Sequence, residues 1–210
     1  LSHPILLTLL ALVLAAGSFR SMLQLTSIIA QVPPELGLGY GLGKGEAIAV
    51  LLAAPNVGIV IGGVCAGWIA GRVGPALPLL GGIVVGAVAT FAMLAGVSAL
   101  PLAIACGALV GMAAGAIGTS GYNLATSVEL PERQGTIAGL VSVMMALGSV
   151  VFSFVGGEIL KATQIVGTAA GGAPVSTATG VYLYVAMAGV LFVLGAVPAI
   201  LLTRRPALPD

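Results

Sequence analysis

Residues 107–140 read GALVGMAAGAIGTSGYNLATSVELPERQGTIAGL, and this stretch decides the fold class. It predicts an apolar helix, a short charged loop and a second apolar helix. Four glycines lie on one face of the first helix, at steps of four, four and three residues: Gly107, Gly111, Gly115 and Gly118. In water each would weaken the helix by roughly 0.5–1 kcal/mol relative to alanine. In lipid, small residues at this spacing let helix backbones pack closely, so we interpret them as helix-packing glycines of a membrane protein.

The composition of the whole chain supports a membrane location. Hydrophobic residues make up 59% of the 210 residues and charged residues only 6%, whereas soluble domains carry about 25% charged residues. So few charges cannot cover a water-facing surface, and lipid must be the solvent. The net charge of +1 and the absence of a basic run give no support to nucleic-acid binding. No signal peptide is expected at Leu1, and the sequence could be a piece of a longer chain.

Six segments are long and apolar enough to span a bilayer, for which about 20 residues are needed. They are Pro4–Ala30, Glu46–Gly71, Ala76–Val97, Pro101–Ser127, Gly135–Leu160 and Val181–Thr203. The sequence therefore predicts an all-α membrane protein with six transmembrane helices. We expect the polar connection from Lys161 to Gly180 to be an ordinary exposed loop.

The positive residues of the short loops predict the orientation. With six spans, both termini lie on one side of the membrane. That side receives Arg72, Arg133, Arg204 and Arg205, whereas the other side receives Lys44 and Lys161. We therefore expect a multi-pass protein of the plasma or inner cell membrane, with both termini in the cytoplasm.

Arg20 is the only charged residue deep inside a span, where a charge costs at least ~2.5–3.5 kcal/mol. Gln24, Ser27 and Gln31 share its helix face. Arg20 lies eleven residues before Gln31, or ~16 Å along the helix, which is far for a side chain that snorkels to the interface. We favour a cavity-lining role for Arg20, with snorkelling as the alternative.

Other polar residues have simpler interpretations. Asn56 follows Pro55 in the second span, where it either compensates for the hydrogen bond that proline removes or faces the same cavity as Arg20. The polar residues at the end of the fourth span are expected to satisfy the helix terminus: Ser120, Tyr122, Asn123 and Thr126. The spacing of three residues between Glu158 and Lys161 predicts an exposed ion pair that contributes little stability.

The third and sixth spans carry no amide or charge in their interior. We therefore expect the first, second, fourth and fifth helices to surround a watery path, and the third and sixth to face lipid. Tyr182 and Tyr184, at the start of the sixth helix, predict an interfacial aromatic belt. Cys65 and Cys106 are interpreted as small core residues.

Two stretches are similar to enzyme motifs. Gly118-Thr-Ser-Gly121 matches the G-x-S-G of rhomboid intramembrane proteases, whose serine also lies on the fourth of six spans. Such a serine needs a histidine base, and the only histidine is His3, before the first span. The glycine cluster from Gly37 to Gly45 lacks the spacing of a phosphate-binding loop. We expect no enzymatic activity, no cofactor and no metal site.

The order of spans and loops resembles the C-terminal six-helix half of a major facilitator superfamily transporter of the drug-exporting kind. Gly67-Trp-Ile-Ala-Gly71-Arg72-Val-Gly74 is similar to the family's G-x-x-x-D-R-x-G loop signature, with Gly71 where the family's first half has an acid. The passage LPERQGTIAG resembles the entry into the eleventh helix of drug exporters through Pro131, Arg133, Gly135 and Gly139. Leu147-Gly148 and Gly156-Gly157 continue that helix in a similar way.

The resemblance implies a single domain, residues 1–210, of two inverted three-helix repeats at residues 4–97 and 101–203. It also implies that the chain helps to move a small organic solute or drug, by export, through alternating access. The substrate path would then be lined by Arg20, Gln24, Ser27 and Asn56. The expected partners are the lipid bilayer, a small-molecule substrate and either an N-terminal six-helix half or a second copy of the chain. The alternative function is a structural or assembly subunit that transports nothing.

Overall fold

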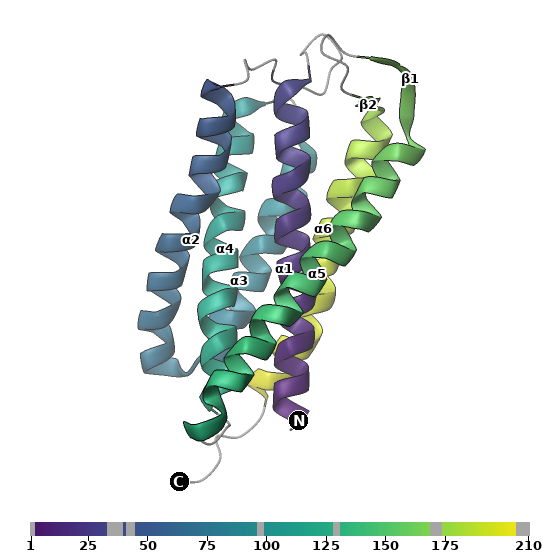
Figure 1. Ribbon diagram of the computed structural model, residues 1–210. Helices are drawn as coiled ribbons and strands as arrows, with labels where there is room; N and C mark the ends of the chain where they lie inside the picture. Colours follow the sequence, from purple (N-terminus) through teal and green to yellow (C-terminus); the bar gives the residue numbers. More distant parts are fainter. Residues whose placement is uncertain are drawn as a thin grey trace.

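The computed structural model describes residues 3–32, 40, 45–95, 99–127, 131–168 and 174–204. Within these residues the chain forms six α-helices and one antiparallel pair of strands (Figure 1). The helices are α1 (His3–Gln31), α2 (Glu46–Val73), α3 (Ala76–Ala92), α4 (Leu100–Ser127), α5 (Gln134–Ala162) and α6 (Ala178–Thr203). The strands are β1 (Gln164–Thr168) and β2 (Pro174–Ser176), and 3-10 turns occupy Met93–Ala95 and Pro131–Arg133.

Five of the helices, all except α3, are long and apolar enough to cross a membrane. The chain is therefore built like a multi-pass membrane protein. The α3 helix has 17 residues and passes into the 3-10 turn at Met93, so it is shorter than the predicted span to Val97. The sequence that follows, Gly96-Val97-Ser98, contains poor helix formers and lies outside the described residues.

The helices pack in a pattern that is the same for the two halves of the chain. The main partner of α2 is α4, and the main partner of α5 is α1. Likewise α3 packs on α4, and α6 packs on α1. The remaining large contacts join α3 to α6 and α1 to α4. Exchanging the first three helices for the last three therefore leaves the pattern unchanged, although α1 and α4 run in opposite directions (Figure 1).

Glycines allow α2 and α4 to touch through their backbones. A Cβ atom on any of four glycines would overlap a carbonyl group of the facing helix. These pairs are Gly58 with Ala108, Gly62 with Met112, Gly111 with Pro55 and Gly115 with Ile59. Of the four glycines that the sequence singled out, the middle two thus lie in the helix contact. A Cβ on Gly107 would only reach van der Waals distance of the Pro55 ring, and a Cβ on Gly118 would have no atom within 4 Å.

Similar close approaches occur at two other helix contacts. The ring of Phe192 in α6 occupies the space above Gly86 in α3, and the ring of Phe91 in α3 occupies the space above Gly189 in α6. Gly148 of α5 lies against the backbone of α1, where a Cβ would overlap the Val13 carbonyl. Packing in this protein therefore depends on small residues, as expected where lipid tails are as apolar as the side chains.

The connection between α5 and α6 is not the ordinary loop that was predicted. Gln164 pairs with Ser176 and Ile165 with Val175 in an antiparallel hairpin, whose residues 169–173 lie outside the described part. The short β-branched runs on both sides of a Gly- and Ala-rich stretch explain it, because such residues favour strands. Thr177 then caps α6, its hydroxyl accepting a hydrogen bond from the Gly180 amide at 3.2 Å.

Two side chains lie on other faces than predicted. Cys65 is exposed on α2, whereas Cys106 is buried as expected; both are free thiols. Tyr182 is exposed, but Tyr184 is fully buried, and its hydroxyl lies near that of Ser21 in α1. Residues two apart on a helix point about 200° from each other, so the two tyrosines cannot share one interfacial belt.

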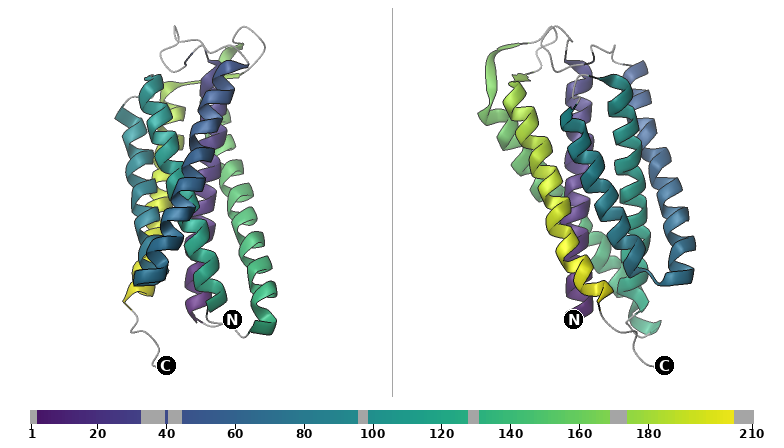
Figure 2. Two further views of the ribbon diagram at one scale, coloured as in Figure 1. Left: turned by 90° about the vertical axis from the view of Figure 1, so that its left-hand side faces the viewer. Right: turned by 180° about the vertical axis from the view of Figure 1, so that it is seen from behind.

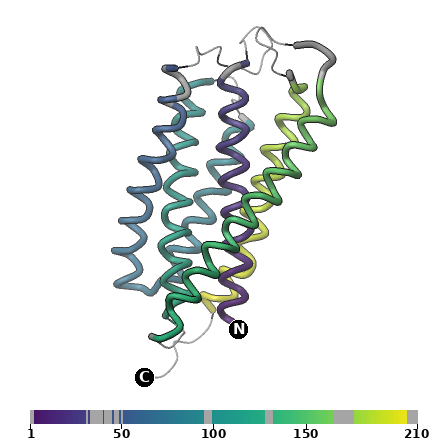
Figure 3. The backbone as a smooth tube through the Cα atoms, in the orientation of Figure 1, coloured from purple at the N-terminus to yellow at the C-terminus, as the bar shows by residue number. Residues whose placement is uncertain are grey.

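The first and last described residues, His3 and Arg204, lie at one end of the bundle, which we call the end with the termini (Figure 2). The backbone trace in Figure 3 shows that α2, α4 and α6 end there and that α5 begins there. Arg72, Arg133 and Arg204 therefore lie at the end with the termini. Lys161 lies at the opposite end, with its ammonium 3.7 Å from the exposed carboxylate of Glu158. Lys44 and Arg205 lie outside the described residues.

This arrangement allows a direct test of the predicted orientation. Single cysteines at Arg133 and at Lys161 would be introduced after both native cysteines are replaced by alanine. In intact cells, a membrane-impermeant maleimide is expected to label Lys161→Cys and to leave Arg133→Cys unlabelled until the cells are opened, because arginine-rich ends stay in the cytoplasm. Labelling of Arg133→Cys alone in intact cells would reverse the topology.

Candidate functional site

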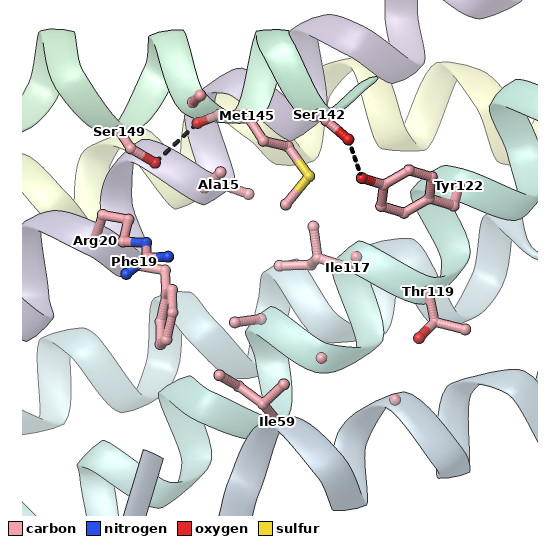
Figure 4. A pocket seen from close by; sticks show the side chains of 16 residues that line it. Ala15, Phe19, Arg20, Ile59, Ile117, Thr119, Tyr122, Ser142, Met145 and Ser149 are labelled. Carbon is pink, nitrogen blue, oxygen red and sulfur yellow. Dashed lines mark hydrogen bonds between the residues drawn. The ribbon is translucent and has the colours of Figure 1, made fainter. Parts of the chain in front are cut away.

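A cavity of about 570 Å³ lies between α1, α2, α4 and α5 (Figure 4). Its wall comes from residues 15–20 of α1, 59–63 of α2, 114–122 of α4 and 142–149 of α5. The volume falls within the range of small-molecule sites, ~300–1,000 Å³. Neither α3 nor α6 contributes to the wall. We call this space the four-helix cavity; it extends from the middle of the bundle toward the end with the termini.

Among the described residues, Arg20 is the only charged one in the wall of the four-helix cavity. Its side chain is exposed, and it forms no ion pair within the part of the chain that the structure describes. Phe19 and Ser21 on either side of it are buried, because α1 is the most deeply buried of the five long helices. The central helix of the bundle therefore holds a guanidinium at the edge of an apolar space.

The rest of the wall is apolar in its middle and polar at two places. Figure 4 shows Met145 and Ile117 between Arg20 on one side and Tyr122 on the other. Ser149 lies on the side of Arg20, and its hydroxyl donates to the Met145 carbonyl at 2.8 Å. The wall thus offers one cationic end, an apolar centre and a second polar end.

Tyr122 and Ser142 form that second polar end. Their hydroxyl oxygens are 2.6 Å apart. The Ser142 hydroxyl is also 3.2 Å from the Ala138 carbonyl, to which it donates its single hydrogen. Tyr122 is therefore the donor in the Tyr122–Ser142 hydrogen bond, and the lone pairs of its oxygen remain available for another group.

The other predicted path residues lie outside this wall. Gln24 is exposed on α1, and the Ser27 hydroxyl donates to the Gln24 carbonyl at 2.8 Å. Asn56 is exposed and donates to the Leu52 carbonyl at 2.6 Å. Because Pro55 frees the carbonyl of residue 51, this bond does not compensate for the proline. Of the four predicted path residues, only Arg20 lines the four-helix cavity; the side chain of Gln31 lies outside the described residues.

Sequence reasoning missed several wall residues, namely Phe19, Thr119, Ser142, Met145 and Ser149. The two serines carried a usable signal, because they are seven residues apart and so share one face of α5. The signal is weak, because serines bonded to their own helix backbone are common in membrane helices. Phe19 and Met145 have no polarity that distinguishes them from lipid-facing positions.

The prediction that polar side chains satisfy the backbone groups at the end of α4 is confirmed only in part. Thr126 donates to the Tyr122 carbonyl at 2.8 Å, and Asn123 is exposed. Ser120 of the protease-like motif is fully buried, and its hydroxyl has no hydrogen-bond partner among the described residues. His3 is an exposed residue at the start of α1.

The loop motifs lie at the end of the bundle with the termini. The guanidinium of Arg72 stacks over the Trp68 ring, 3.5 Å from its centroid, a cation–π contact. Gly74 ends α2 with φ of +82°, a conformation that favours glycine. The other motif residues make few contacts: Gly67 only meets the Thr119 methyl, and Arg133, Gly135 and Gly139 are exposed. The Pro131 side chain lies outside the described residues.

Tyr40 lies at the opposite end of the bundle. It packs against Ala30 of α1, Leu51 of α2 and Ala103 of α4. Burial raises the pKa of Tyr40 to about 12, with a smaller contribution from Cys106. The Tyr40 hydroxyl therefore stays protonated at physiological pH and adds no charge to this end.

Comparison of the chain with models of protein families finds no matching family, and comparison with curated proteins finds no matching relative.

Proposed function

We propose that this chain is one six-helix half of a secondary transporter of the major facilitator kind, which moves a small organic solute across a membrane by alternating access. The four-helix cavity carries this proposal. It has the volume of a small-molecule site, and its wall comes from the four helices whose interior polarity predicted a watery path. A charged residue inside a membrane helix marks a substrate or ion path by default, and Arg20 lies in this wall.

The packing pattern supports two inverted repeats, α1–α3 and α4–α6. Each helix of the first set meets the partner that its counterpart meets in the second set. The contact between α3 and α6 is reciprocal at the level of side chains, with Phe91 over Gly189 and Phe192 over Gly86. Inverted repeats with a site near the midplane are a common plan of secondary transporters.

A sixth span is needed for this plan, and α3 with its 3-10 turn can supply it. The 17 helical residues and three turn residues extend roughly 31 Å at 1.5 and 2.0 Å per residue. The hydrocarbon core of a bilayer is ~30 Å thick. The shorter third helix is therefore compatible with six transmembrane segments.

A structural or assembly subunit is the alternative, favoured by the glycine-packed contact between α2 and α4. The two functions differ in whether water reaches the four-helix cavity. Ala146 lines the cavity on α5, whereas Val150 of the same helix is 68% exposed and is absent from the wall. Single cysteines at these positions make a matched pair.

In membranes, a charged methanethiosulfonate reagent is expected to react with Ala146→Cys at least about ten times faster than with Val150→Cys, because the reactive thiolate forms in water and not in lipid. Both native cysteines would first be replaced by alanine. Mass spectrometry of the purified protein gives the modified fraction over time. Equal, slow reaction at both positions would mean that the cavity is dry, and the transport proposal would be wrong.

A further inference from the structure

Among the described residues, no carboxylate balances the charge of Arg20 at its depth. The chain has six acidic residues. Glu46 begins α2, Glu132 lies in the 3-10 turn before α5, and Glu158 lies near the end of α5. The other three lie outside the described residues: Glu35, Glu129 and Asp210. Arg20 lies eleven residues from one end of α1 and 17 from the other, or ~16 and ~25 Å. No acidic residue that the structure describes therefore belongs to the same layer of the bundle as the guanidinium.

A guanidinium that borders an apolar cavity and has no carboxylate at its depth can be balanced by an anion from outside the helix bundle. Removal of a charge from bulk water is costly unless an opposite charge and hydrogen bonds compensate. The guanidinium carries five N–H donors in a planar fork, which suits a carboxylate, sulfonate or phosphate oxygen pair. Ser149, on the same side of the cavity, has an oxygen that can meet a further polar group.

We infer that the four-helix cavity binds an amphiphilic organic anion, with the anionic group on Arg20 and the apolar body along Ile117 and Met145. This inference rests on the proposed function and names the substrate class. The apolar centre of the wall separates Arg20 from the Tyr122–Ser142 pair. A ligand that reaches this pair would place a hydrogen-bond donor there, because the Tyr122 oxygen has lone pairs to accept it.

A lipid headgroup is the other source of an anion with this chemistry. The hydrocarbon core is ~30 Å thick, so a phosphate at its surface lies ~15 Å from the midplane, near which Arg20 is placed. To reach Arg20, a lipid headgroup would have to move that distance into the membrane. A solute that enters the cavity from water would not. The structure therefore favours a dissolved anion, and the experiment separates the two sources.

The test uses two fluorescent probes with one aromatic skeleton. 1-Anilinonaphthalene-8-sulfonate carries a sulfonate, and N-phenyl-1-naphthylamine lacks it. Both would be titrated against the 210-residue chain in phosphatidylcholine nanodiscs, as wild type, Arg20→Gln and Arg133→Gln. Arg133 is exposed at the start of α5, outside the cavity, so its variant controls for loss of one positive charge.

Arg20→Gln is expected to raise the apparent Kd of the sulfonate about ten- to a hundredfold, as loss of a hydrogen-bonded charge pair does. The Kd of the neutral probe should stay unchanged, which also shows that the variant keeps its cavity. Arg133→Gln should change neither value. Added 1-naphthoate should displace the sulfonate, and 1-naphthylmethanol should not.

Several results would overturn the inference. An equal loss of affinity for both probes in Arg20→Gln would mean that Arg20 only shapes the cavity. Unchanged affinity for the sulfonate probe in Arg20→Gln would mean that Arg20 contacts no anion. Displacement by lysophosphatidylglycerol but not by 1-naphthoate would assign the anion to a lipid headgroup. In each case rapid reaction of Ala146→Cys would leave the transport proposal standing, so the two failures are distinguishable.

Discussion

Gly115→Ala is expected to lower the stability of the helix bundle by about 2–3 kcal/mol, at the upper end of the usual cost of overpacking. A Cβ on Gly115 would overlap the Ile59 carbonyl and lie 2.8 Å from the Gly63 amide nitrogen. Both obstacles are backbone atoms, so no change of rotamer can relieve the clash. The helices α2 and α4 must move apart, and the contacts of Gly58, Gly62 and Gly111 would be lost with it.

Gly118→Ala provides the matched control in the same helix. Its Cβ has no neighbour within 4 Å, and alanine is a better helix former than glycine. We expect its stability to equal or slightly exceed that of the wild type. Thermal unfolding of the purified protein in detergent measures both variants. Equal midpoints for Gly115→Ala and Gly118→Ala would contradict the backbone contact between α2 and α4.

The 210-residue chain alone is expected to form pairs in the membrane and to transport nothing. Arg20 is exposed at the edge of the four-helix cavity, and an isolated chain would present it to lipid at a cost of at least ~2.5–3.5 kcal/mol. Two copies related by a two-fold axis along the membrane normal would cover both cavities. This arrangement imitates the two halves of a complete transporter.

Cross-linking with a bis-maleimide tests the pairing without knowledge of the substrate. In a background with alanine at both native cysteine positions, Ala146→Cys is expected to yield a covalent dimer. Val190→Cys, exposed on the outer face of α6, should stay monomeric. A dimer from Val190→Cys alone would mean that the chains meet through their outer faces. Saturable uptake of 1-anilinonaphthalene-8-sulfonate by liposomes holding only this chain would show that six helices suffice.

The sequence by itself determined the fold class and the ends of most helices. Long apolar runs are a local property, and they are interrupted at Arg72–Pro75 and near Glu129 by residues that lipid does not accept. The starts of α2 and α3 and the end of α4 therefore fall where predicted. The depth of Arg20 is likewise a count of residues along one helix, so its candidacy as a cavity residue needed no tertiary information.

Only the tertiary structure decided which face of each helix meets which neighbour. In water a polar stripe marks the exposed face of a helix, whereas here lipid-facing and buried positions are equally apolar. Gly115 and Gly118 look alike in sequence, yet one touches the backbone of α2 and the other faces the four-helix cavity. Gln24 and Asn56 appeared to share a path with Arg20, and neither lines the cavity. Faces are set by backbone contacts between helices, and those contacts depend on residues far apart in the chain.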